Sequence, residues 1–109
     1  MNEPKFSYND IIDEFCKRIQ TACDKLVDEL KTFEGQDLKD EKVSAKLTLL
    51  ERKIAWARSE YSFKSPNLLQ DNPSAVKICQ DRSKEIVDEM NETVKDWFLQ
   101  NHQKESENK

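Results

Sequence analysis

The sequence predicts an all-α fold, specifically an antiparallel up-down-up three-helix bundle. Only one glycine and three prolines occur among the 109 residues, whereas a β-sandwich or barrel of this size needs many turn residues. Three long segments place apolar residues three or four positions apart, the spacing that gathers side chains on one helix face. The expected organisation is a lead-in at 1–6, a bundle at 7–100 with helices at about 7–33, 38–63 and 73–99, and a polar, flexible tail at 101–109.

The first segment has an apolar row and recognisable ends. Ser7 can cap its first turn, because a side-chain oxygen satisfies an unpaired backbone N–H there. Gly35, the only glycine, follows the last apolar residue, where a left-handed backbone conformation costs glycine least. The apolar row predicted to face the core consists of Ile12, Phe15, Ile19, Ala22, Leu26, Leu30 and Phe33.

The second segment carries two apolar rows, and Asp37 is its predicted N-cap. Leu49, Trp56 and Phe63 repeat every seven residues and form the second row, called here the Trp56 row. A helix packed against two neighbours needs so wide an apolar face, which favours a central core helix. Alternatively, part of the Trp56 row is exposed for a partner, since aromatic residues are enriched at binding hot spots. The first row consists of Val43, Leu47, Leu50, Ile54, Ala57 and Tyr61.

The third segment follows a break at residues 64–72, where Pro66 and Pro73 restrict the backbone. Pro73 suits the first position of a helix, because that position needs no N–H donor. The apolar pattern fades after Leu99. The row predicted to face the core consists of Val76, Cys79, Ser83, Ile86, Met90, Val94 and Trp97.

Composition argues against several classes of function. The net charge of −4 disfavours nucleic-acid binding, which relies on lysine and arginine to neutralise phosphates. No apolar run approaches the roughly 20 residues that span a bilayer, so we expect no membrane insertion. Residues 1–6 lack the pattern of a signal peptide. Three cysteines without framework spacing favour a reducing compartment, cytoplasmic or otherwise intracellular.

The residues that could support catalysis or bind a metal lack the necessary patterns. His102 is the only histidine and falls in the predicted polar tail, whereas a catalytic histidine must be held rigidly against a nucleophile. Cys16, Cys23, Cys79 and His102 do not have the spacing of a zinc site. One glycine cannot build a phosphate-binding loop. We therefore expect no enzyme activity, no cofactor and no metal.

The third segment carries carboxylates at helical spacing that its own sequence does not neutralise. Like charges four residues apart weaken a helix by a few tenths of a kcal/mol, and Lys84 and Lys95 offset this only in part. The acidic stripe, as we call it, consists of Asp81, Glu85, Asp88, Glu89, Glu92 and Asp96.

The second segment provides cations that could neutralise the acidic stripe across the bundle. One interpretation is such neutralisation, or plain solvation of the stripe. The other is a docking face for a partner with a basic surface, because complementary charge steers encounter and selects partners. The cations are Lys39, Lys42, Lys46 and Lys53 along one face, with Arg52 and Arg58 nearby.

Two family resemblances concern the arrangement of helices. Residues 26–50, with Phe33-Glu34-Gly35 closing one helix and residues 47–51 in the next, resemble the BAG domain. That resemblance implies a three-helix co-chaperone module that binds the ATPase domain of heat-shock chaperones and promotes nucleotide release. The helix order, with Asn72-Pro73 before the third helix, also resembles the N-terminal regulatory domains of syntaxin-type SNAREs. Residues 81–85 keep one arginine and one lysine and then turn acidic, so no BAG contact residues carry over.

The sequence therefore predicts a non-enzymatic protein–protein interaction module, an adaptor or regulatory domain, that binds through an exposed helix face. The acidic stripe and Trp56 are the candidate binding residues. The alternative is a structural subunit that completes a larger helical or coiled-coil assembly. The identity of the partner and the oligomeric state stay open.

Overall fold

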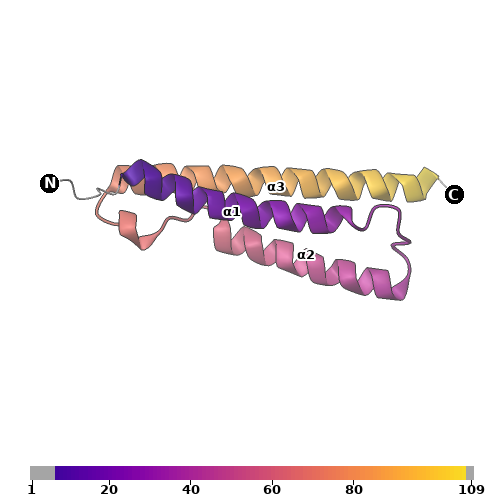
Figure 1. Cartoon of the computed structure of the whole chain (residues 1–109). Helices are drawn as coiled ribbons and strands as arrows, with labels where there is room; N and C mark the ends of the chain where they lie inside the picture. The colour runs from indigo at the N-terminus through magenta and orange to yellow at the C-terminus, as the bar shows by residue number, and fades with distance from the viewer. Residues whose placement is uncertain (1–6, 108–109) are drawn as a thin grey trace.

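The part of the chain that the structure describes contains three α-helices, one short 3-10 helix and no strand. These are α1 (Tyr8–Lys31), α2 (Glu41–Tyr61), η1 (Asn67–Leu69) and α3 (Pro73–Glu107). The computed structural model describes the backbone of residues 7–107 and the side chains of residues 7–101. Figure 1 shows α1 and α3 running in one direction while α2 returns alongside them, so the three-helix bundle is confirmed. The predicted lead-in at residues 1–6 lies outside the described residues.

The ends of α1 follow the local chemistry of its sequence. The hydroxyl of Ser7 accepts a hydrogen bond from the backbone N–H of Asn9 at 3.1 Å, so Ser7 is the N-cap as predicted. The helix ends at Lys31, two residues before the expected end, and Phe33 packs into the core from the turn that follows. Gly35 has a φ of 81°, in the left-handed region that glycine adopts readily.

The start of α2 corrects the predicted cap. Asp40, not Asp37, is the N-cap, because its carboxylate accepts hydrogen bonds from the N–H groups of Lys42 and Val43 at 3.1 and 3.2 Å. Asp37 instead accepts from the N–H of Lys39 at 3.0 Å. Aspartate suits either a cap or a local turn, and the structure has Asp37 in the turn and Asp40 at the cap. The helix therefore begins at residue 41 rather than 38.

The third helix is longer than the apolar pattern predicts. Its backbone is helical to Glu107, whereas we expected the helix to end near residue 99. Residues 100–107 are mainly glutamine, lysine and glutamate, which have helix propensities close to that of alanine. The helix can therefore continue beyond the end of the apolar pattern.

The core has two parts because the helices differ in length. Helix α2 has 21 residues and α3 has 35, or about 32 and 52 Å at 1.5 Å per residue. All three helices contribute to the larger part. Beyond the end of α2, Leu69 of η1 fills the smaller part against α1 and α3. This smaller part consists of Ile12, Cys16, Leu69, Ala75 and Cys79.

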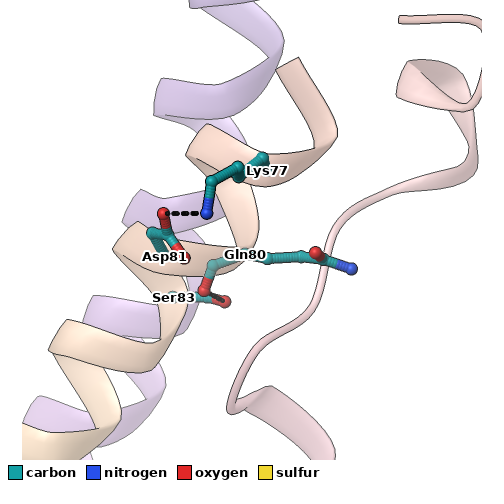
Figure 2. A network of polar contacts seen from close by, with 4 residues as sticks. All are labelled: Lys77, Gln80, Asp81 and Ser83. Carbon is teal, nitrogen blue, oxygen red and sulfur yellow. Dashed lines mark hydrogen bonds and ion pairs between the residues drawn. The ribbon is translucent and has the colours of Figure 1, made fainter. Parts of the chain in front are cut away.

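Ser83, which is completely buried, joins the segment after α2 to α3. Its Oγ accepts a hydrogen bond from the N–H of Lys64 at 2.8 Å and donates to the carbonyl oxygen of Gln80 at 2.9 Å or of Lys64 at 3.1 Å. Figure 2 shows Ser83 on α3 one turn from Gln80, whose side chain extends toward the connecting segment. These bonds hold the chain just after Phe63, whose φ of 60° is costly for a residue with a side chain.

We expect Ser83→Ala to lower the free energy of unfolding by about 1–3 kcal/mol, because it removes the partner of polar groups on Lys64. Urea unfolding followed by far-UV circular dichroism measures this change. Ser59→Ala, at an exposed position of α2, is the matched control and should change stability by less than about 0.5 kcal/mol. Equal effects of the two substitutions would show that the Ser83 hydrogen bonds do not hold the connecting segment.

Candidate protein-interaction site

All six residues of the acidic stripe are exposed on α3. Two of them form ion pairs within the helix, Asp81 with Lys77 at 3.4 Å and Asp88 with Lys84 at 2.7 Å, the first of which Figure 2 shows. Hydrogen bonding to Asp88 raises the pKa of Lys84. Among the described residues the other four carboxylates, those of Glu85, Glu89, Glu92 and Asp96, form no ion pair.

The cations of α2 do not pair with the acidic stripe. Lys53 of α2 approaches Glu29 of α1, with Nζ and Oε2 3.7 Å apart. No ion pair joins α2 to α3 among the described residues. Neutralisation across the bundle therefore does not occur through direct pairs, and the acidic stripe is a solvated surface.

Polar groups continue from the acidic stripe onto α1. A shallow groove of about 410 Å³ between α1 and α3 brings Glu89 beside Asp24 and Asp28. The large apolar side chains of this groove, such as Met90, belong to the core and are covered. This side of the bundle therefore offers charge to a partner but no exposed apolar side chain within the groove.

The Trp56 row is exposed, contrary to the prediction that it packs in the core. The exposed fractions are 57% for Leu49, 58% for Trp56 and 52% for Phe63. Helix α2 packs against α1 and α3 with its first apolar row only, through residues such as Leu50 and Ile54. Phe63 lies beyond the end of the helix. The structure therefore agrees with the alternative interpretation, in which Trp56 is exposed.

Leu49 and Trp56 border a groove of about 630 Å³ between α1 and α2. The rings of Tyr61 and Trp56 form a T-shaped pair, nearly at a right angle and with 5.8 Å between their centroids. This geometry is favourable for aromatic pairs. Because this contact already restricts the Trp56 side chain, less of its conformational entropy is lost when a partner binds. The complete lining consists of Glu29, Thr32, Phe33, Lys46, Leu49, Leu50, Arg52, Lys53 and Trp56.

The charge on the rim of this groove is mainly positive. Lys46, Arg52 and Lys53 line it from α2, and Glu29 is the one carboxylate in the lining. Glu29 is already paired with Lys53. Lys46 and Arg52 form no ion pair among the described residues and are exposed. An apolar surface with free cations at its edge results.

The sequence did not predict which residues of α1 line the groove. Thr32 and Phe33 lie at the end of α1, and their position against α2 depends on the turn around Gly35. Sequence periodicity gives the face of one helix but not its rotation relative to another helix. In the sequence, only the seven-residue spacing of Leu49 and Trp56 indicated this site.

The cysteines are free, buried and divided between the two parts of the core. Cys16 and Cys79 belong to the smaller part, whereas Cys23 belongs to the larger. Burial, with a smaller effect of the Asp24 charge, raises the pKa of Cys23 to about 11. Burial and then the neighbouring Cys16 raise the pKa of Cys79. Because the thiolate is the reactive form, these side chains behave as small apolar residues.

Compared with known proteins, the chain matches no protein-family model, no curated protein and no solved structure. Neither the BAG nor the SNARE resemblance thus becomes a family assignment. Within the described residues, no helix is both long enough and apolar enough to cross a membrane. The candidate site rests on its own geometry and charge.

We expect the two tryptophans to respond differently to solvent. Trp56 is mostly exposed, whereas Trp97 is 6% exposed and donates its indole N–H to Oε1 of Glu34 at 3.2 Å. Fluorescence of Trp97→Phe should be red-shifted and readily quenched by acrylamide, because only Trp56 then emits. Fluorescence of Trp56→Phe should be blue-shifted and protected. Equal quenching of both variants would contradict the exposure of Trp56.

We expect all three thiols to resist a thiol-directed reagent in the folded protein at mildly alkaline pH. Burial denies the reagent access to all three side chains, and the raised pKa values of Cys23 and Cys79 also deprive it of the thiolate there. Labelling followed by absorbance, with and without urea, checks this expectation. Rapid labelling of any cysteine without urea would show that the core opens where the structure has it closed.

Proposed function

We propose that this protein is a non-enzymatic protein–protein interaction module that binds its partner in the groove between α1 and α2. The observation that carries this proposal is the exposure of Leu49 and Trp56 in one groove with a cationic rim. Single exposed apolar residues are common. Here two share a concave surface with Arg52, and tryptophan and arginine are enriched at binding hot spots.

The acidic stripe supports this function in a different way. It is charged and solvated, and it lacks the covered apolar centre of a typical interface. Charges in such a setting act mainly on the rate and orientation of encounter. A partner with a basic surface would be attracted to it, but the tight contacts would form in the groove.

A structural subunit is the second candidate function. The seven-residue spacing of Leu49 and Trp56 is the repeat by which helices pack in coiled coils. The same groove would then be covered permanently by other helices of a larger assembly. This candidate predicts that the isolated protein associates with itself or loses stability, which sedimentation and urea unfolding measure.

The direct test removes the apolar surface of the groove. We expect Leu49→Ser/Trp56→Ser to weaken binding of a partner by at least about 25-fold, because loss of a hot-spot residue costs about 2 kcal/mol or more. Affinity capture from a native lysate, quantified by mass spectrometry against the unchanged protein, identifies proteins whose recovery depends on the groove.

Two control variants make the result specific. Ile78→Ser/Leu99→Ser removes two apolar side chains of α3 that are 49% and 51% exposed. Because both lie outside the groove, this variant should retain the partner. Glu85→Lys/Glu89→Lys tests the acidic stripe and should slow association more than it speeds dissociation. A partner lost only on reversal of the acidic stripe would place binding on α3 and contradict the proposal.

A further inference from the structure

The groove has the dimensions of a seat for one helix. Lys46 and Trp56 mark its extent along α2, a distance of about 15 Å at the helical rise of 1.5 Å per residue. That length corresponds to about three helical turns. Helix α2 forms one wall over this length, and Glu29 with Thr32 and Phe33 at the end of α1 forms the opposite wall over about one turn. Figure 1 shows α1 and α2 side by side. An added helix would contact both of them.

The apolar surface of the groove also repeats at a helical interval. Leu49 and Trp56 are two turns apart on α2, and Phe33 contributes from the end of α1. A partner helix with apolar residues three or four positions apart presents one stripe that fits such a repeat. A peptide that binds by adding a β-strand would instead need an exposed sheet edge, and the described part of the chain contains no strand.

The positive charges on the rim indicate that the partner helix carries negative charge. Lys46 and Arg52 are exposed beside the apolar surface and have no ion-pair partner among the described residues. The chain as a whole carries a net charge of −4, so the charge of this rim is opposite in sign to that of the whole chain. Carboxylates flanking the apolar stripe of the docking helix would be attracted to the rim, so this helix binds in the groove, while the basic surface that the acidic stripe attracts lies elsewhere on the partner.

From these three features we propose that the groove binds an acidic amphipathic helix of about three turns, with apolar residues facing Leu49 and Trp56 and carboxylates facing Lys46 and Arg52. This inference rests on the interaction function proposed above. A concave seat between two helices fits a helical ridge better than the flat surface of an anionic membrane, although both carry the same charge.

The test uses designed peptides as probes. One is alanine-rich, about four turns long, with leucines three and four positions apart and flanking glutamates. The second has lysines in place of the glutamates, and the third has a central proline that breaks the helix. Binding is followed by Trp56 fluorescence in Trp97→Phe and by anisotropy of a labelled peptide. We expect the glutamate peptide to bind, the other two to bind at least about tenfold more weakly, and rising salt to reduce the affinity.

A charge exchange makes the test specific to the groove. Lys46→Glu/Arg52→Glu should weaken binding of the glutamate peptide at least about tenfold and strengthen that of the lysine peptide. Arg58→Glu/Lys95→Glu is the matched control, because both cations are exposed, lie outside the groove and give the same change in charge. The control should bind the glutamate peptide nearly as the unchanged protein does.

The other outcomes overturn the proposal in distinguishable ways. Equal binding of the glutamate and lysine peptides would overturn the acidic partner, and equal binding of the proline peptide would overturn the helix. If Trp56 responds to phosphatidylserine vesicles but to no peptide, the groove recognises a membrane. If no peptide binds while Leu49→Ser/Trp56→Ser still loses a partner from lysate, the interaction function stands and the helical occupant is wrong. If that variant also loses no partner, both proposals fail.

Discussion

The packing of α1 against α3 is the interaction on which the rest of this structure depends. These two helices run side by side and in the same direction (Figure 1), and they meet in both parts of the core. Small side chains lie along this contact, including Cys16 and Cys23 of α1 and Cys79 of α3. Because the separation of two helices depends on the side chains between them, small residues allow α1 and α3 to approach closely.

Close packing of this pair limits what α2 can bury. With α1 and α3 already in contact, α2 covers them with one row of apolar residues and turns Leu49 and Trp56 outward. Its 21 residues also leave one end of the pair uncovered, and there Leu69 completes the core. The exposed groove therefore follows from how α2 packs on the pair of α1 and α3, and exposure of apolar surface is what a docking site requires.

Much of the fold could be predicted because it depends on local chemistry. Helical spacing located all three helices, and Ser7 and Pro73 lie at the helix starts as expected. Gly35 adopts the expected left-handed conformation, but in the turn that follows the Thr32 C-cap and not at the end of the helix. The choice of Asp40 over Asp37 as a cap could not be predicted, since both residues suit the role. The exposure of Trp56 was one of two interpretations, because its spacing shows that an apolar row exists but not whether a second helix covers it.

The central claim is that binding occurs in the groove between α1 and α2 and not on the acidic stripe. The most direct test is nitrogen-proton NMR mapping of backbone amides during titration with the acidic amphipathic peptide. This account predicts shifts concentrated at residues 29–33 of α1 and its following turn and at residues 46–56 of α2, with the outer face of α3 unaffected. Shifts concentrated at residues 81–96 of α3, with the groove unaffected, would contradict it.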